Sequence, residues 1–143
     1  MTQTKVIEES VKDYADAITE NYRRYHIRTL KGNLSGNYPE YAREQLAEIE
    51  NGTANLMKFK VYTGKRYYKI VQQEFETWEG SKYYGQYRDA SVHAFVDKKT
   101  GQIYKPAGWA KPAKHVRYNL LDDSSYAQCL TRADWAGSYL YLR

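Results

Sequence analysis

The sequence predicts an α+β fold in which two N-terminal helices pack on an antiparallel sheet of about five strands. Apolar residues recur every three or four positions up to Gly52, and beyond it apolar and polar residues alternate. The chain has 143 residues, the length of one ordinary domain. We therefore expect a single domain, residues 1–143, with a helical part at 1–52 and a β-rich part at 53–143.

Two helical patterns precede Gly52. The first is a stripe that ends before a loop at Gly32–Gly36, and such a stripe packs on a sheet or against a second copy of itself. We favour the sheet. The second helix should begin at Pro39, which suits a first turn, and end at Asn51-Gly52. The first stripe consists of Ile7, Val11, Tyr14, Ile18, Tyr22 and Tyr25, and the second of Ala42, Leu46 and Ile49.

Two hairpins are predicted beyond Gly52. The first joins strands at 57–61 and 68–70 through the turn Thr63-Gly64-Lys65. The second joins the alternating stretch 91–97 to a short strand at 102–105 through a tight turn ending at Gly101. In that alternation His93 and Phe95 share one face, opposite Val92 and Ala94. Between the hairpins, the sequence GSKYYGQYRD at 80–89 predicts a long loop that a ligand or partner would order.

The last part of the chain should add one helix and one strand. Asp122, Asp123 or Ser124 can cap a short helix through Tyr126 to Leu130. The apolar and aromatic sequence WAGSYLYL at 135–142 predicts a terminal strand within the sheet.

Composition and charge favour an anionic partner. The formal net charge is +5, and the segment 98–121 contains six Lys and Arg residues without an acid. Cys129 is expected to be a buried structural cysteine, and the three histidines show no metal-ligand spacing, so we expect neither a metal nor a cofactor. No apolar run is long enough to cross a membrane and no signal peptide is evident. We expect a cytoplasmic protein without a membrane partner.

The candidate binding segment is KPAGWAKPAKHVRYN, residues 105–119. Its prolines restrict the backbone, which lowers the entropy lost when a loop closes on a ligand. Aromatic faces can stack on a base and cations can donate to phosphate. The candidate residues are Lys105, Trp109, Lys111, Lys114, Arg117, Tyr118 and Asn119. The alternative is a stiff surface loop whose lysines are solvated and whose tryptophan packs into the core.

Signatures of the common enzyme classes are missing. The chain has no GxxxxGK[ST] loop, no GxGxxG turn and no GxSxG turn. An acid–base pair of His93 and His115 that cleaves a phosphodiester is the alternative, although nothing in the sequence brings the two rings together. We expect a protein that is not an enzyme.

One block of sequence resembles a known family. The run SVHAFVDKKTGQIYKPAGWAKPAKHVRYNLLDD, followed by RADWAGSYLYLR, resembles small proteins of unassigned function encoded by tailed bacteriophages. Those proteins share a VDKKTGxIYKPAxWxxPAKxxRxN block before a terminal DWAGSYLY. The resemblance covers residues 91–143, and it implies a bacteriophage origin and a location in the infected bacterial cell.

The order of elements and the cationic, aromatic segment are also similar to the Thoeris anti-defence sponge proteins of phages. Those proteins oligomerise through helices and sequester a cyclic ADP-ribose signal without cleaving it. This similarity implies a sponge for a small nucleotide immune signal and a homodimer or higher homo-oligomer formed through the N-terminal helix.

We therefore expect a non-enzymatic binding protein that sequesters a small anionic, phosphate-bearing nucleotide, such as a cyclic ADP-ribose or a cyclic nucleotide. One alternative is a nucleic-acid-binding accessory protein, whose basic segments and exposed tyrosines form a stripe along a strand. Another is a protein inhibitor or virion component that works through its tyrosine-rich surface.

Overall fold

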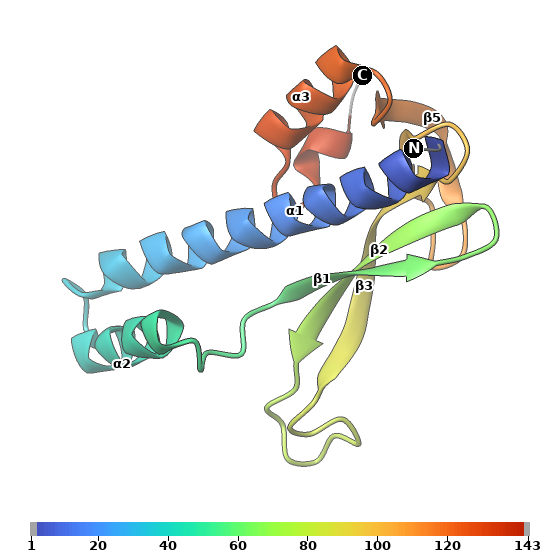
Figure 1. Cartoon of the computed structure of the whole chain (residues 1–143). Helices are drawn as coiled ribbons and strands as arrows, with labels where there is room; N and C mark the ends of the chain where they lie inside the picture. The colour runs from blue at the N-terminus through green and yellow to red at the C-terminus, as the bar shows by residue number, and fades with distance from the viewer. Residues whose placement is uncertain (1–2, 142–143) are drawn as a thin grey trace.

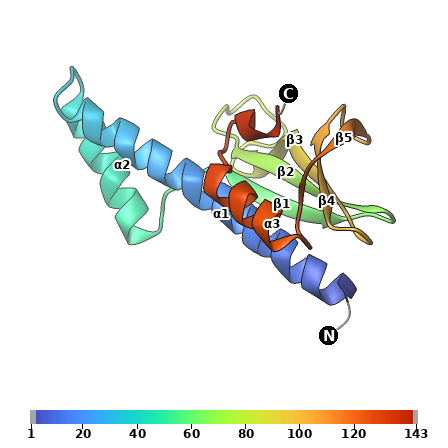
Figure 2. The ribbon, with the colours of Figure 1, turned by 90° about the horizontal axis from the view of Figure 1, so that it is seen from above.

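A computed structural model describes residues 3–141, which form an α+β fold with helices on one side of an antiparallel sheet (Figures 1 and 2). The sheet order is β1-β2-β3-β4-β5, so each strand pairs with its neighbour in the sequence. The predicted fold class is confirmed. The elements are α1 (Gln3–Asn33), α2 (Pro39–Asn51), β1 (Lys58–Thr63), β2 (Tyr67–Phe75), β3 (Tyr87–Asp97), β4 (Gln102–Pro106), β5 (Pro112–Asn119), α3 (Asp123–Arg132) and the short 3-10 helix η1 (Ser138–Leu140).

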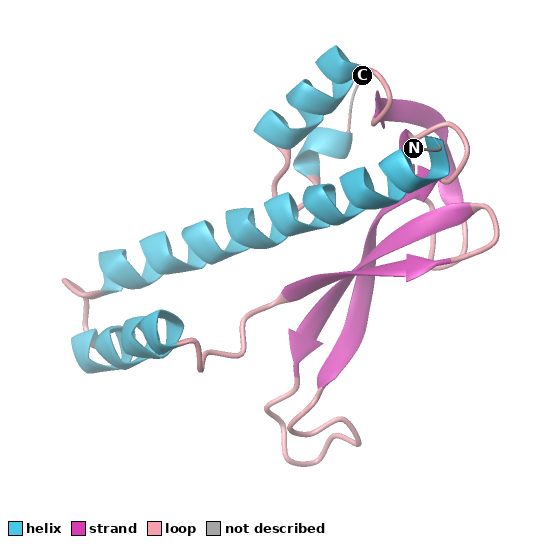
Figure 3. Cartoon of the chain, in the orientation of Figure 1, coloured by secondary structure: helices cyan, strands magenta, loops and turns pink. Residues whose placement is uncertain are grey.

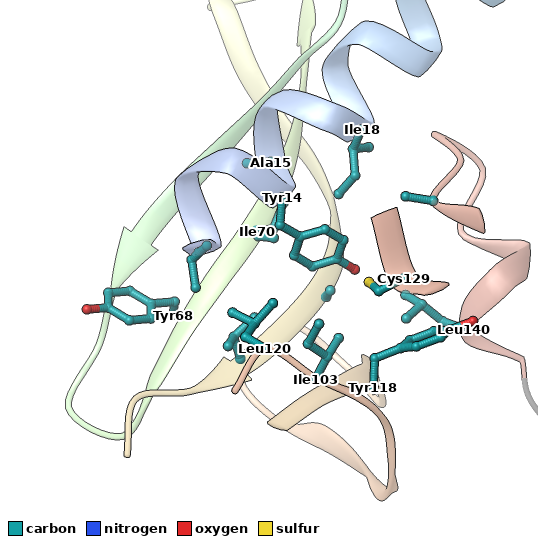
Figure 4. Close-up of a cluster of buried hydrophobic side chains, with 14 of the residues drawn as sticks. Tyr14, Ala15, Ile18, Tyr68, Ile70, Ile103, Tyr118, Leu120, Cys129 and Leu140 are labelled. Atoms are coloured by element: carbon teal, nitrogen blue, oxygen red, sulfur yellow. The ribbon is translucent and has the colours of Figure 1, made fainter. Parts of the chain in front are cut away.

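The first half of α1 packs on the sheet, as its apolar stripe predicts. Ile7, Val11, Tyr14 and Ile18 are each fully buried. They meet side chains from the sheet, from α3 and from η1 in one core (Figure 4). Burying four such side chains contributes several kcal/mol to folding, because each is worth about 1.5–3 kcal/mol. This core holds α1 and α3 on the same face of the sheet.

The second half of α1 extends past the sheet and pairs with α2 (Figure 1). Leu30, Ala42 and Ile49 form a separate small core between the two helices. Helix α2 begins at Pro39 and ends at Gly52, whose φ of 76° is the left-handed conformation that glycine adopts without strain. We call residues 19–51 the helical arm, because they form a helix pair beside the sheet.

The segment 105–119 is a β-hairpin rather than a loop. Residues up to Pro106 end β4, and β5 returns from Pro112 to Asn119. Across the turn, the amides of Ala107 and Gly108 donate to the carbonyl of Lys111 at 2.9 and 3.2 Å. The sequence did not predict β5, because proline is rare inside strands and the segment contains two prolines. Pro106 and Pro112 face each other where the hairpin begins, so neither interrupts the pairing further along it.

The prediction of a terminal strand at 135–142 is wrong for residues 135–141, which form no strand. Residue 142 lies outside the described range. The chain turns at Asp134, whose carboxylate accepts from the amides of Gly137 at 2.8 Å and Ser138 at 3.3 Å. Gly137 has a φ of 82°, and η1 follows. Side-chain hydrogen bonds to the backbone thus replace a strand ladder. Tyr139 and Leu140 are buried as predicted for apolar residues, but from a short helix.

The loop between β2 and β3, residues 76–86, lies at the opposite end of the sheet from the β1–β2 turn (Figure 3). Hydrogen bonds within the loop hold it together. The Glu76 amide donates to the Gln86 carbonyl at 2.9 Å, and the Gly85 amide donates to the Glu76 carbonyl at 3.0 Å. Arg88 also forms an ion pair with Glu76 at 2.9 Å. The loop lies a few residues earlier in the sequence than the predicted 80–89, since β3 already begins at Tyr87, and these internal contacts fix its backbone.

Candidate functional site

A hollow lined by aromatic and cationic side chains lies on the face of the sheet away from α1 and α3. It is a cleft of about 490 Å³ between the β1–β2 turn, the strands β2 and β3, and the β4–β5 turn. No helix among residues 3–141 covers this face (Figure 2). We call this hollow the open-face cleft. Its lining residues are Tyr62, Thr63, Gly64, Lys65, Arg66, Tyr67, Lys69, Val71, Asp89, Phe95, Trp109 and Ala110.

Strand alternation explains why aromatic and cationic side chains gather in the open-face cleft. Lys69 pairs with Tyr62 on β1 and with Phe95 on β3, and directly paired residues share a face of the sheet. The ring of Tyr67 meets Phe95 edge to face with centroids 5.8 Å apart. The guanidinium of Arg66 lies 5.1 Å from the Tyr67 ring. The cleft therefore combines π-faces with donors to an anion.

Trp109 is held at the wall of the open-face cleft by a contact from another strand. The Lys69 ammonium donates to the Trp109 carbonyl at 2.6 Å and lies 5.9 Å from the Phe95 ring. The Trp109 side chain is 51% exposed. An exposed indole at the edge of a cleft has a free face for a planar ligand group.

A carboxylate lies at the other side of the open-face cleft. The Tyr62 hydroxyl donates to both oxygens of Asp89 at 3.0 Å, and Gln73 donates to the same group at 2.8 Å. Loss of solvent contact and the nearby Asp89 charge raise the pKa of Tyr62. Tyr62 thus remains a neutral donor at ordinary pH. Asp89 is an acceptor that a sugar hydroxyl or a base amino group can use.

The seven residues predicted from the sequence do not line one hollow. Trp109 lines the open-face cleft. Lys105 reaches a different part of the molecule, with its ammonium 4.3 Å from the Tyr141 ring. Lys111 in the turn and Lys114 on β5 have exposed side chains. The hairpin separates these residues because successive side chains of a strand point to opposite faces.

Of the other three predicted residues, Tyr118 and Asn119 serve the fold. The Tyr118 ring is buried, and its hydroxyl donates to the carbonyl of Tyr139 at 3.1 Å. The Asn119 side chain accepts from the Leu121 amide at 2.8 Å and shapes the turn into α3. Arg117 is half-buried, and within residues 3–141 its Nε has no hydrogen-bond partner. Tyr118 and Asn119 are therefore left out of the site we propose below.

A buried chain of polar side chains was missed by the sequence prediction. His93 was expected to face outward beside Phe95, but Ile70 pairs with Ala94 and Val71 pairs with Val92, so His93 is the extra residue of a β-bulge. The bulge turns its ring inward, since a bulge redirects a side chain. There His93 Nε2 lies 2.8 Å from the Tyr139 hydroxyl, which also bonds to the hydroxyl of Tyr14.

The environment of this buried chain keeps its members neutral. Burial lowers the pKa of His93 to about 4, although the Asp134 carboxylate opposes the shift. Burial also raises the pKa of Cys129 to about 12, so this thiol, buried as the sequence predicted, is protonated at neutral pH. The second histidine of the alternative acid–base pair, His115, is exposed on β5 and does not belong to this chain of side chains.

Two further features are absent from residues 3–141. No group of three or more His, Cys, Asp and Glu side chains is arranged to hold a metal ion in that range. None of the helices there is long and apolar enough to cross a bilayer.

Comparison with known proteins assigns the chain to a family. Residues 2–142 match the model of a family of unknown function, DUF7717. The chain belongs to this family, in agreement with the resemblance to proteins of unassigned function. A search of curated proteins returned no match. A search of solved structures returned none either.

Proposed function

We propose that this protein is a non-enzymatic binding protein that captures a small phosphate-bearing nucleotide in the open-face cleft. The observation that carries the proposal is the combination in one cleft of aromatic rings from β2, β3 and the β4–β5 turn with cations from the β1–β2 turn. Its volume of about 490 Å³ lies in the range of small-molecule sites, about 300–1,000 Å³.

In this proposal each part of the cleft binds one part of the nucleotide. The base stacks on Trp109, the phosphate accepts from Lys65 and Arg66, and Asp89 accepts from a sugar hydroxyl. Arg66 suits phosphate because its guanidinium presents two parallel donors. The resemblance to phage sponge proteins suggests a cyclic ADP-ribose or a cyclic nucleotide as the ligand, and an infected bacterial cell as its location.

The proposal is tested by calorimetry of the purified protein with AMP, cyclic AMP, cyclic GMP and ADP-ribose. We expect saturable binding of at least one ligand, and recovery of the intact ligand after the protein is heat-denatured. Trp109→Ala should weaken binding at least about fivefold, because stacking on an aromatic side chain is worth about 1–3 kcal/mol per base. Recovery of a cleaved ligand would instead support an enzyme.

The matched control is Trp78→Ala. Trp78 is also an exposed tryptophan, at 69%, but it lies in the β2–β3 loop at the far end of the sheet. This substitution should leave nucleotide affinity unchanged. Equal losses in the two variants, or no binding of any nucleotide, would contradict the proposed site.

A second candidate function is binding of single-stranded nucleic acid along the same face. It is favoured by two cation and aromatic pairs on β1 and β3. The Lys60 ammonium lies 4.8 Å from the ring of Tyr62, which lines the cleft, and beyond the cleft the Lys58 ammonium lies 4.0 Å from the Tyr87 ring. An oligonucleotide series in the same calorimetry distinguishes the two functions. Affinity that rises with strand length and falls steeply with salt indicates nucleic acid. A nucleotide pocket is indifferent to length.

A further inference from the structure

A second hollow adjoins the open-face cleft at the end of the sheet. It has a volume of about 480 Å³ and lies between the β1–β2 turn and the β3–β4 turn. Lys65 and Arg66 line both hollows, so the two hollows adjoin at this pair of cations. Lys98 and Lys99 line the second hollow and do not line the open-face cleft. We call this second hollow the basic end.

Hydrogen bonds hold the two turns of the basic end together. The amide of Lys98 donates to the Arg66 carbonyl at 3.0 Å, and its ammonium donates to the Gly64 carbonyl at 3.0 Å. Asp97 accepts from the amides of Lys99 at 2.8 Å and Thr100 at 3.0 Å. The four lysine and arginine side chains therefore extend from turns whose backbones are held in place before a ligand binds, which lowers the entropy cost of binding.

The charges of the basic end are unbalanced. Four cations, Lys65, Arg66, Lys98 and Lys99, surround one carboxylate, that of Asp97, which is 6% exposed. Burial alone would raise the pKa of Asp97, but the amides of Lys99 and Thr100 and the Arg66 guanidinium hold it below its usual value. Asp97 is thus ionised at neutral pH, and it still leaves an excess of positive charge that an anion can neutralise.

We infer that the ligand carries two linked phosphates, as a nucleoside diphosphate does. In this arrangement the base occupies the open-face cleft, the first phosphate binds at Lys65 and Arg66, and the second phosphate binds at Lys98 and Lys99. A monophosphate reaches the shared pair of cations but leaves the second pair without an anion. The inference rests on the proposed function, and it names the ligand class of the same site.

The test is calorimetry at fixed ionic strength with paired nucleoside 5′-monophosphates and 5′-diphosphates of adenine, guanine and uracil. The diphosphate should bind about tenfold or more tightly than its monophosphate, because hydrogen bonds to charged groups are worth about 1.5–3 kcal/mol. The double substitution Lys98→Ala with Lys99→Ala should abolish this gain, so that the diphosphate and the monophosphate of each nucleoside bind with similar affinity.

Two controls separate a specific site from general charge attraction. The double substitution Lys31→Ala with Lys82→Ala removes the same charge from exposed positions in the helical arm and the β2–β3 loop, and it should keep the gain. Lys99→Ala alone is the second variant, since it keeps both the bond of the Lys98 ammonium to Gly64 and the bond of the Lys99 backbone amide to Asp97. Lys99→Ala should reduce the preference for the diphosphate over the monophosphate, and it tests the site even if the double variant is unstable.

Each outcome decides between the two proposals. Monophosphates and diphosphates that bind with equal affinity overturn this inference and leave the proposed function standing. A gain that survives loss of Lys98 and Lys99 also overturns it. If no nucleotide of either series binds, both proposals are wrong.

Discussion

His93 shows how one residue's position in the fold controls its charge. Its ring lies in the interior between Phe59, whose ring centroid is 5.2 Å away, and the hydroxyl of Tyr139. Little compensates there for the lost hydration of an imidazolium. The folded protein therefore requires neutral His93, and its pKa is lowered to about 4.

This requirement predicts an acid-dependent loss of stability. The unfolded chain binds a proton at His93 near its ordinary pKa of 6.5, whereas the folded chain does so only near 4. The contribution is thus complete above pH 6.5 and is lost as pH falls from 6.5 toward 4, by roughly 3 kcal/mol. Urea unfolding across this range measures it. In His93→Gln the dependence on pH should be clearly flatter than in the wild type.

The matched control is His115→Gln, because His115 is exposed on β5. This variant should retain the wild-type slope between pH 6.5 and 4. If His93→Gln and His115→Gln change the slope equally, the neutral state of His93 does not contribute as described.

Helix α3 begins in a set of local contacts that connect it to the sheet. The Asp122 carboxylate accepts from the Ser125 amide at 3.2 Å, as the predicted cap requires. The Ser125 hydroxyl accepts in turn from the Asn119 amide at 2.8 Å, at the end of β5. The cap therefore positions the helix and, through it, the buried Cys129 in the core.

Asp122→Ala removes this cap and should lower the free energy of unfolding by about 1 kcal/mol. Chemical denaturation measures the change. Ser124→Ala is the control, because Ser124 is an exposed neighbour in the first turn, and it should change stability by less than about 0.5 kcal/mol. A similar loss in both variants would mean that the cap does not stabilise the helix.

At the scale of the whole molecule, the helical arm is the surface on which the predicted self-association can be tested. Tyr38 and Tyr41 are exposed at 77% and 59% on the arm. The part of α1 within the arm carries four cations and one acid, and α2 carries four acids and one cation. They are Arg23, Arg24, Arg28, Lys31 and Glu20 on α1, and Glu40, Glu44, Glu48, Glu50 and Arg43 on α2. Opposite charges on the two helices suit an antiparallel pairing of arms from two copies.

Self-association through the arm predicts a mass above that of one chain, 16.8 kDa, in size-exclusion chromatography with light scattering. Tyr38→Ser combined with Tyr41→Ser should shift the protein toward the monomer. Tyr83→Ser with Tyr84→Ser is the control, since these exposed tyrosines belong to the β2–β3 loop. A wild-type protein that is monomeric at all concentrations would refute the prediction.

The sequence predicted elements whose signals are local. Both N-terminal helices and the β1–β2 and β3–β4 hairpins were readable from periodicity, and Gly52 and Gly101 marked where a helix and a turn end. The signal for the open-face cleft was also present, because alternation places Tyr62, Lys69 and Phe95 outward. The contiguous cluster at 105–119 gave a stronger local pattern, but its side chains alternate between the two faces of the sheet.

By itself, then, the sequence determined the fold class, the existence of α1, α2 and α3, the start and end of α2, and a cationic, aromatic composition typical of anion binding. Those properties depend on hydrogen bonds and burial within single elements. Only the tertiary structure decided that Trp109 joins β2 and β3 at one cleft, that His93 turns inward at a bulge, and that residues after Asp134 coil instead of extending. These outcomes depend on pairing register and on contacts between residues far apart in the chain, which no local pattern specifies.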